Sequence, residues 1–258
     1  MPDAVFVDTN QLRREGAEGF FGNVAALEQL ARVADLHIPA IVIEEIKWQK
    51  RRKMKTDLAK FKSNYFFQHV QADADAMEAH IEERIEELYQ AAAAEIEFIE
   101  CPLVEDILHL PHLQDLSLQK LAPFDLSGDK GFKDACIYLT ICKFLETTDD
   151  EVFLLSNDGR LGEAFSENAR VHVLKNAEAF FDIRSSYFRE DYFLQRLSGA
   201  FNEEYQEDAV NIALIAQDIK SVDMNEDDEW IIAVQSEAVN FVAVVDFYSR
   251  EVIEFRNV

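Results

Sequence analysis

The sequence has little glycine, eight residues in 258, and none of it forms a glycine-rich loop of the kind that binds phosphate groups. The six histidines show no metal-ligand spacing, and the three cysteines include no CxxC pair. The segment SNDGR at 156–160 does not match a nucleophile elbow, and no Ser-His-Asp order is apparent. These absences argue against a phosphate-binding loop, a zinc site and serine-hydrolase chemistry.

Long apolar runs are absent as well. No stretch approaches the roughly 18 uninterrupted apolar residues of a membrane-spanning helix, and no basic segment followed by an apolar one opens the chain. Cys101, Cys136 and Cys142 are odd in number, and the last two lie in an apolar helical run, which is typical of buried thiols in a reducing compartment. We therefore expect a soluble cytoplasmic protein that does not contact membranes.

Positive charge is scarce. The chain has 50 Asp and Glu against 25 Lys and Arg, which gives a formal net charge of −25. Such a balance argues against a generally adhesive nucleic-acid or membrane binder, although it leaves room for a local basic patch. Since 48% of the residues are apolar, the composition is sufficient for one large α/β domain, alone or with a small appendage.

Buried strands alternate with helices through residue 182, which predicts an α/β fold around a mainly parallel sheet. The expected strands lie at 4–7, near 38, near 96–99, at 151–155 and at 171–174. The expected helices lie at 19–35, 41–62, 73–95, 131–146 and after the turn at 156–160. Residues 102–128 are expected to form short helices and loops, because they contain three prolines.

The character of the chain changes near residue 185. Residues 185–258 hold sixteen Asp and Glu against five Lys and Arg, with a helix expected at 187–205. The segments EWIIAVQS, VNFVAVVDF and EVIEF then read as three consecutive antiparallel strands. We predict an α/β domain over 1–184, with a helical insertion at about 50–125, and an acidic α+β appendage over 185–258.

Two of the predicted strands end at an acid. AVFV is followed by Asp8, and VFLL is followed by Ser156, Asn157 and Asp158. Each acid alone is well explained as a turn former or helix cap. Because ligands of open parallel sheets bind at the carboxyl ends of the strands, the repetition favours a shared site.

Two further acids fall on faces that point inward. Asp134 shares a helical face with Tyr138 and Ile141, although a carboxylate in the first turn of a helix is also tolerated for structural reasons alone. Glu45 aligns with apolar positions of the 41–62 helix more convincingly than Glu44 does. Clustered carboxylates stay ionised only around cations, and oxygen ligands without His or Cys suit Mg²⁺ or Mn²⁺.

The ordered segments FVDTN, IPAIVIEEI, GDKGFKDACI and LLSNDGRL resemble the PIN-domain family of nucleases over roughly residues 3–182. The resemblance implies a Rossmann-like three-layer α/β/α fold and metal-dependent cleavage of single-stranded RNA. It assigns the family's acids to Asp8, Glu45, Asp134 and Asp158, with Asn10 steadying the first of them. Two further candidates for supporting roles are Asn157 and Asp129, the latter either an additional ligand or the cap of the following helix.

The chain departs from compact members of the family in two places. About 90 residues separate the second acid from the third, as in a larger bacterial PIN-like subgroup, and the acidic C-terminal part lies outside the family core. The first departure contains KWQKRRKMKTDLAKFK at 47–62, which has eight Lys and Arg and one acid. Its candidate nucleic-acid contacts are Lys47, Lys50, Arg51, Arg52, Lys53 and Lys55. The same segment could instead pair with the acidic helix at 78–87.

We therefore expect an Mg²⁺- or Mn²⁺-dependent endonuclease that hydrolyses phosphodiester bonds in single-stranded or structured RNA, in a toxin–antitoxin or phage-defence setting. Single-stranded DNA is the second substrate considered, an antitoxin or other protein is a candidate partner, and an oligomer is compatible with the sequence. The alternative is a catalytically silent PIN fold that binds RNA or protein. A haloacid-dehalogenase-type phosphatase is disfavoured, because position 10 is Asn where that chemistry requires a second Asp.

Overall fold

The computed structural model of the chain describes residues 3–13, 19–63, 74–105, 109–126, 130–205, 212–225, 227–236, 238–247 and 249–257. The chain divides into two compact units, residues 3–177 and 178–258. Asp129, residue 73 at the start of the predicted 73–95 helix, and residues 106–108 and 127–128 of the predicted short helices and loops lie outside the described residues. The predicted domain boundary at 184/185 stays a prediction; the compact units divide seven residues earlier, at the start of a helix.

The first unit is built around a five-stranded sheet with the order β3-β2-β1-β4-β5. Every neighbouring pair in it is parallel. Its strands are β1 (Asp3–Val7), β2 (Ala34–Pro39), β3 (Ile99–Cys101), β4 (Val152–Leu155) and β5 (Val171–Leu174). The two central strands are almost wholly buried, as expected for a parallel sheet with both faces covered.

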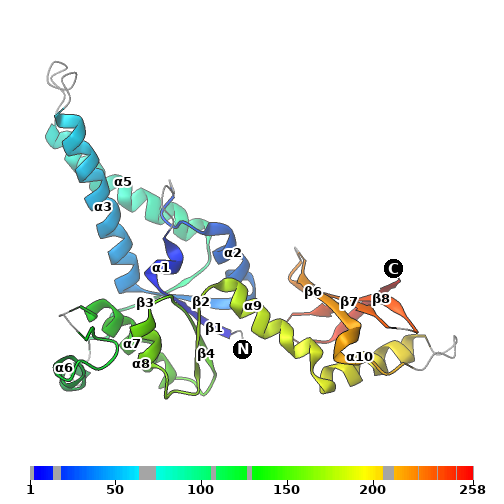
Figure 1. The fold of residues 1–258 in the computed structure, drawn as a ribbon. Coiled ribbons are helices and arrows are strands. Elements are labelled where there is room, and N and C mark those ends of the chain that lie inside the picture. Colours follow the sequence, from blue (N-terminus) through cyan, green and yellow to red (C-terminus); the bar gives the residue numbers. More distant parts are fainter. Residues whose placement is uncertain are drawn as a thin grey trace. The chain divides into compact units, whose positions relative to one another are not determined.

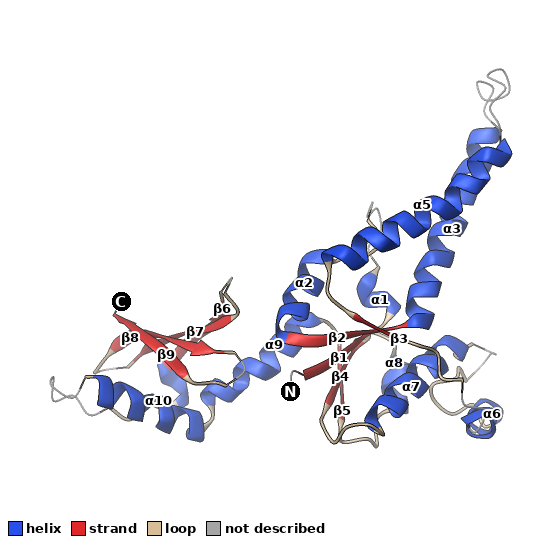
Figure 2. Ribbon diagram, turned by 180° about the vertical axis from the view of Figure 1, so that it is seen from behind, coloured by secondary structure: helices blue, strands red, loops and turns tan. Residues whose placement is uncertain are grey.

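Helices cover both faces of this sheet, with α2 on one side and α7 and α8 on the other (Figures 1 and 2). The helices next to the sheet are α1 (Thr9–Leu12), α2 (Val24–Val33), α7 (Phe132–Leu145) and α8 (Gly159–Ala164). The short helix α6 (Leu110–Leu118) lies away from the sheet, where Leu113 clusters with residues of α7 (Figure 2). This is the predicted three-layer α/β/α arrangement, so the predicted fold class is confirmed.

Two long helices form an antiparallel hairpin that extends from the first unit (Figure 1). They are α3 (Ala40–Lys62) and α5 (Ala74–Glu95). Only the start of α3 is buried, through Val42, Ile43 and Ile46, because from Lys47 onward the sequence is dominated by charge. The hairpin accounts for much of the long separation between the second and third acids.

The second unit contains α9 (Ala177–Ser186, whose first residue belongs to the first unit), α10 (Asp191–Glu204) and short 3₁₀ turns at Tyr187–Arg189 and Ala216–Asp218. Its antiparallel sheet has the order β6-β7-β8-β9, formed by Ile219–Met224, Glu229–Gln235, Asn240–Asp246 and Val252–Asn257. Aromatic contacts join helix and sheet, since Phe201 stacks on Phe241 with ring centroids 4.4 Å apart. The predicted three-stranded meander is present, and the sequence reading missed β6 before it.

Candidate active site

The acids predicted to form a site follow the carboxyl ends of the central strands or lie on neighbouring helices. From β1 the chain proceeds to β2 on one side, and it later returns to place β4 on the other side. The junction of β1 and β4 is therefore the topological switch point, where open α/β sheets bind their ligands. Asp8 directly follows β1, and Asp158 lies three residues after β4.

Asp8 is 5% exposed, and hydrogen bonds hold its carboxylate on several sides. It accepts from the backbone N–H of Thr9 at 2.6 Å and from the Ser156 hydroxyl at 2.7 Å. The amide of Asn10 also donates to it, while the Asn10 carbonyl oxygen accepts from the backbone N–H of Asn157 at 3.2 Å. Asn10 thus links the loops after β1 and β4, and the Asn157 contribution comes from its backbone.

Asp158 is the N-cap of α8. Its Oδ1 accepts from the backbone N–H groups of Arg160 and Leu161 at 2.8 and 2.9 Å. Its own N–H donates to the Ser156 hydroxyl at 3.0 Å. The cap uses Oδ1, so the role of helix cap and a role in ligand binding through Oδ2 are compatible.

Glu45 faces the same region from α3. Its carboxylate accepts from the Thr9 hydroxyl at 2.9 Å, from the Gln49 amide at 3.1 Å and from the Lys133 ammonium group. Burial alone would raise the pKa of Glu45, but the hydrogen bonds from Lys133 and Thr9 outweigh it and hold the pKa below its usual value. Glu45 is therefore ionised and already compensated by a cation.

Asp134 enters from the first turn of α7. Gly131 precedes that turn with φ 110°, a backbone conformation that residues with a side chain rarely adopt. A Cβ at Gly131 would lie 2.7 Å from the Cα of Phe124 and the carbonyl oxygen of Pro123, so the backbones touch closely there. This contact sets the start of α7 and hence the position of Asp134.

The site has an excess of negative charge. Burial, followed by the nearby Asp158 and Asp8 carboxylates, raises the pKa of Asp134 to about 6. Burial also raises the pKa of Asp8, against the opposing effect of its hydrogen bond from Ser156. These shifts have the causes expected for acids gathered in a partly desolvated cavity.

One cavity of about 800 Å³ is lined by all four predicted acids. Its other polar lining residues include Thr9, Asn10, Arg13, Gln49, Asp125, Lys130, Lys133 and Arg160. The donor set consists of hard carboxylate oxygens with mutual repulsion, and this chemistry fits Mg²⁺ or Mn²⁺. Among the described residues, however, no three Asp, Glu, His or Cys side chains are gathered closely enough to enclose one ion as they stand.

The remaining predicted residues divide into three groups. Asp129 lies outside the described residues, so its two alternative roles stay open. Of the predicted nucleic-acid contacts, Lys47 and Arg51 are paired with Glu86 and Glu82 of α5. The others, Lys50, Arg52, Lys53 and Lys55, belong to the same helix without an ion pair to an acid among the residues that the structure describes.

Sequence reasoning missed the groups that orient the acids. The Ser156 hydroxyl, the Thr9 hydroxyl and the Lys133 ammonium group each contact one or more of them. Arg160 also lines the cavity, and its guanidinium group donates to the carbonyl oxygen of Lys120 at 2.9 Å and to that of Phe124 at 2.6 Å and 2.9 Å. The sequence could have indicated only Thr9 and Ser156. Thr9 directly follows Asp8, and Ser156 lies two residues before Asp158.

Fold and site together define an α/β protein with a carboxylate-lined cavity at the topological switch point of its sheet. A PIN-domain family profile matches residues 5–161, more than half of the chain, so the chain belongs to the PIN-domain family. Neither the curated proteins nor the solved structures gave a significant match. PIN domains are generally nucleases that use divalent metals, and the predicted resemblance is confirmed. No helix among the described residues is both long and apolar enough to cross a membrane.

Proposed function

We propose that the protein is a metal-dependent endoribonuclease that cleaves single-stranded or looped RNA at the cavity described above. The observation that carries the proposal is the convergence of four carboxylates, from four separate elements, on one cavity at the switch point of a PIN domain. The four acids are far apart in the sequence, at positions 8, 45, 134 and 158. Their mutual repulsion would be unfavourable without a cationic ligand to balance it.

The residues would divide the work as follows. Asp8, Asp134 and Asp158 would hold Mg²⁺ or Mn²⁺, and Glu45 would complete the set or orient the attacking water. When bound, the cation supplies charge neutralisation at the phosphate and lowers the pKa of water. The carboxylate of Asp8 would be held ready for the cation, since Ser156, Asn10 and the Thr9 N–H donate to it.

Two cationic side chains would also act on the substrate. Lys133 and Arg160 line the cavity beside the acids, where positive charge stabilises a phosphate that gains negative charge in the transition state. Attack in line by water with departure of the 3′ oxygen leaves a 5′ phosphate and a 3′ hydroxyl. These product ends are part of the proposal and can be read directly from labelled fragments.

The experiment is cleavage of end-labelled single-stranded RNA and DNA in Mn²⁺, with wild type, Asp8→Asn and Asp158→Asn compared. We expect the rate to fall at least about a hundredfold in both variants, because each removes a charge that balances the cation. Asp115→Asn, an exposed acid on α6, is the matched control and should cleave as wild type does. Undiminished cleavage in both site variants would reject the site.

A second readout does not depend on activity. Titration calorimetry with Mn²⁺ should detect binding to the wild type and weakened binding to Asp134→Asn. RNA binding without metal-dependent cleavage of any substrate would instead favour a catalytically silent binding module, for which the Glu45–Lys133 pair is the structural argument. A cytoplasmic location and a toxin–antitoxin or phage-defence setting, with an antitoxin as partner, are the biological contexts we propose for the nuclease.

A further inference from the structure

The basic residues of α3 lie on two different faces of the helix. One face pairs with the acidic side of α5: Lys47 with Glu86 at 3.0 Å, Arg51 with Glu82 at 2.7 Å, and Lys62 with Glu78 at 3.0 Å. The spacing of these three lysines and arginines matches the turns of one helix face. The positive charges on this face are therefore paired with acids of α5.

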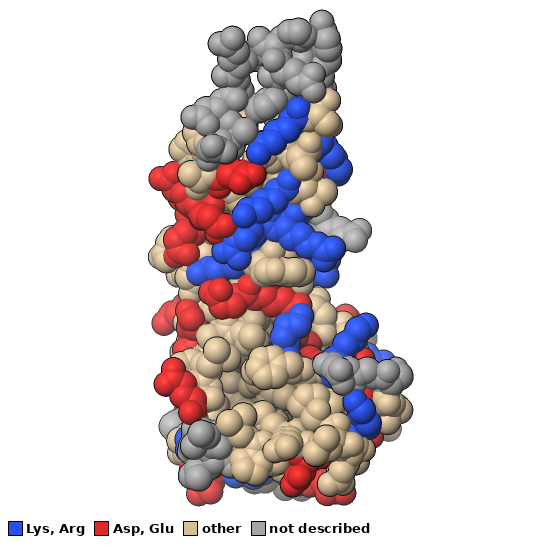
Figure 3. Space-filling model, turned by 90° about the vertical axis from the view of Figure 1, so that its left-hand side faces the viewer, with Lys and Arg blue, Asp and Glu red and all other residues tan. Residues whose placement is uncertain are grey.

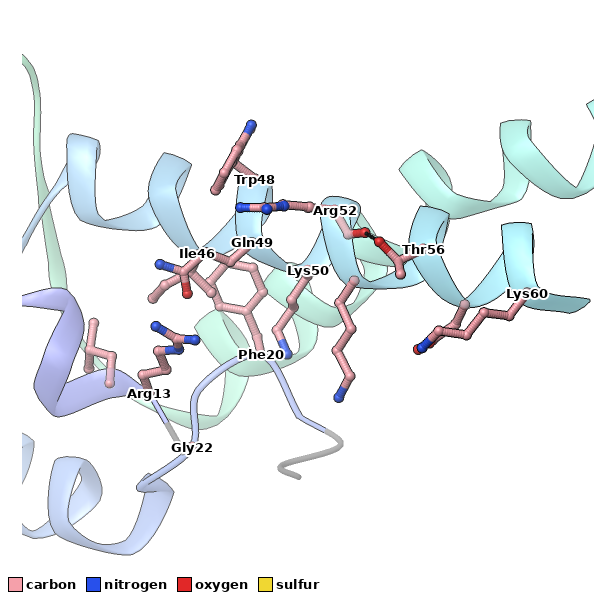
Figure 4. A pocket seen from close by; sticks show the side chains of 13 residues that line it. Arg13, Phe20, Gly22, Ile46, Trp48, Gln49, Lys50, Arg52, Thr56 and Lys60 are labelled. Atoms are coloured by element: carbon pink, nitrogen blue, oxygen red, sulfur yellow. Dashed lines mark hydrogen bonds and ion pairs between the residues drawn. The ribbon is translucent and has the colours of Figure 1, made fainter. Parts of the chain in front are cut away.

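The other face of α3 lines a second cavity, of about 710 Å³, together with the chain that follows α1. Its charged lining residues are Arg13, Lys50, Arg52, Lys53, Lys60 and a single acid, Asp57. Figure 4 shows Arg13, Gln49 and Lys50 directed into the space between α3 and the loop that carries Phe20 and Gly22. We call this cavity the basic groove.

Positive charge in the basic groove is poorly compensated. Asp57 pairs with Lys60 at 3.1 Å, and among the described residues no ion pair joins Lys50, Arg52 or Lys53 to an acid. Burial, with a further contribution from the neighbouring Lys53, lowers the pKa of Lys50, as expected where like charges gather. Lys and Arg gather in the upper half of the face shown in Figure 3, beside an acidic patch. In a protein of net charge −25, this local excess of positive charge is suited to an anionic ligand.

The groove also offers an aromatic surface. Trp48 is 52% exposed, and the guanidinium group of Arg52 lies 5.4 Å from its ring centroid. Large aromatic side chains are usually buried, so an exposed one beside cationic residues is notable. Single-stranded nucleic acids are bound by this combination, in which cations follow the phosphates and aromatic rings stack on bases.

The basic groove adjoins the acid cavity. Arg13 and Gln49 line both cavities, and the Gln49 amide donates to Glu45 at 3.1 Å. A strand whose phosphate lies among the acids would therefore meet the basic groove within a short distance along its backbone. The two cavities have opposite charge, which suits the two different tasks of holding a cation and holding a polyanion.

We propose that the basic groove binds the single-stranded RNA on one side of the cleavage position, with an unstacked base on Trp48 and the phosphates on Arg13, Lys50, Arg52, Lys53 and Lys60. The inference rests on the proposed function for the identity of the strand. It replaces the sequence-derived set of contacts: Lys50, Arg52 and Lys53 stay, Arg13 and Lys60 are added, and Lys47 and Arg51 are assigned to the hairpin. Lys55 leaves the set as well, because its charge acts on Glu78 and Glu82 of α5.

The test compares two triple variants of the full chain that remove the same charge from the same helix. The groove variant carries Lys50→Ala, Lys53→Ala and Lys60→Ala, and the hairpin variant carries Lys47→Ala, Arg51→Ala and Lys62→Ala. Binding of a labelled oligouridine is measured by filter retention over a range of salt concentrations. EDTA is present throughout, so that neither the cation nor cleavage contributes.

We expect the groove variant to bind at least tenfold more weakly, with a salt slope reduced by about two, because each lost phosphate contact on a single strand contributes about 0.7. The hairpin variant should lose less than about threefold. Equal losses in both variants, or undetectable binding by the wild type in EDTA, would overturn the proposal. Circular dichroism melts check that both triple variants are folded.

A single substitution provides an independent arm if the groove variant does not fold. Trp48→Ala removes a largely exposed ring and should weaken oligouridine binding about tenfold by loss of stacking. Duplex RNA of equal length should bind the wild type much more weakly, since its bases cannot stack on Trp48. Unchanged binding by Trp48→Ala, or equal binding of duplex RNA, would overturn the single-strand assignment.

The same measurements separate the two proposals. If Asp8→Asn abolishes cleavage but the two triple variants bind RNA equally well, the nuclease stands and the basic groove is rejected. If Asp8→Asn leaves cleavage unchanged while the groove variant alone loses RNA binding, the acid site is rejected and the basic groove stands. RNA binding in EDTA by Asp8→Asn should equal that of the wild type, since the acid is not part of the groove.

Discussion

Ser156 holds two of the four acids in place through one hydroxyl group. It donates to the Asp8 carboxylate at 2.7 Å and accepts from the backbone N–H of Asp158 at 3.0 Å. Ser156 is itself buried, so no water can easily replace these bonds. Together with the Asn10–Asn157 hydrogen bond, this hydroxyl joins the loops after β1 and β4.

Ser156→Ala should lower the free energy of unfolding by about 1–3 kcal/mol, because Asp8 stays buried with fewer donors. Urea denaturation measures the change. Ser63→Ala is the matched control: the Ser63 hydroxyl is exposed, donates to the carbonyl oxygen of Lys60, and should contribute little. Equal stability of the Ser156→Ala variant and the wild type would show that the hydrogen bond to Asp8 is dispensable.

Asp134 makes stability depend on pH. Its pKa rises from 3.8 to about 6 on folding, so between these pH values the folded protein binds more protons than the unfolded chain. Stability therefore falls as the pH rises through this window. In EDTA at pH 7.5, Asp134→Asn should be more stable than the wild type by roughly 1–2 kcal/mol, a value reduced for partial exposure, and the difference should vanish near pH 4.

The measurement is urea denaturation of both proteins at several pH values, with Asp115→Asn as the exposed control that should follow the wild type. Adding Mn²⁺ at pH 7.5 should raise the Tm of the wild type and have little effect on Asp134→Asn. A variant that is less stable than the wild type at pH 7.5 in EDTA would contradict the account of charge crowding.

At the residue scale, the sequence predicted the acids better than their surroundings. Asp8 and Asp158 could be predicted because the end of a buried strand is recognisable in the sequence as an apolar run followed by polar residues. Lys133 could not, since its contact with Glu45 joins residues 88 positions apart whose partnership leaves no local pattern. Whether the four acids act on a substrate is a prediction that cleavage will decide.

At the scale of single elements, α7 shows how one glycine sets a site. Gly131 has a positive φ and lies against the backbone of Pro123 and Phe124, three residues before Asp134. The helix is otherwise well determined by its sequence, because Ile137, Ile141 and Leu145 are buried along one face. Its entry into the cavity therefore depends on a backbone contact.

Gly131→Ala should lower the free energy of unfolding by about 1–3 kcal/mol, since the new Cβ meets backbone atoms at 2.7 Å in an unfavourable φ region. Gly159→Ala is the control at the start of α8, where a Cβ would meet nothing within 4 Å. Thermal and urea denaturation of both variants provide the comparison. A larger effect at Gly159 would refute this explanation.

The helical insertion was predictable in part. The expected helices at 41–62 and 73–95 agree with α3 and α5, because charged and alanine-rich segments of that length have few alternatives. The division of the basic residues between two faces was not predictable, since it depends on how α5 is rotated against α3. The ion pairs with α5 confirm that part of the basic segment pairs with the acidic helix, whereas RNA binding by its other face stays a prediction.

At the scale of the whole molecule, the chain consists of two units that each bury their own core. In the second unit, 178–258, Phe201 of α10 stacks on Phe241 of the sheet, and Phe188 of the 3₁₀ turn packs against Trp230 of the sheet. The sequence indicated this composite character through the change in charge near residue 185. It did not indicate β6, whose short polar segment IKSVDM lacks a clear alternation.

We expect a fragment of residues 178–258 to fold alone, because its aromatic core is formed within the fragment. Its circular dichroism should show a cooperative thermal transition and a β-sheet contribution. The fragment 1–177 should retain the cleavage proposed for the full chain. A fragment 178–258 without a cooperative transition would indicate that the second unit depends on the first.

Each unit contains one of the two tryptophans of the chain, and the two differ strongly in solvent exposure. Trp48 in α3 is 52% exposed, whereas Trp230 in β7 is 3% exposed. Excited near 295 nm, the chain should therefore emit as the sum of a red-shifted, iodide-quenchable component and a blue-shifted, protected one. In Trp48→Phe the only emitting tryptophan is Trp230 of the second unit. In Trp230→Phe it is Trp48, beside the basic groove. Each unit of the protein thus carries its own intrinsic optical reporter.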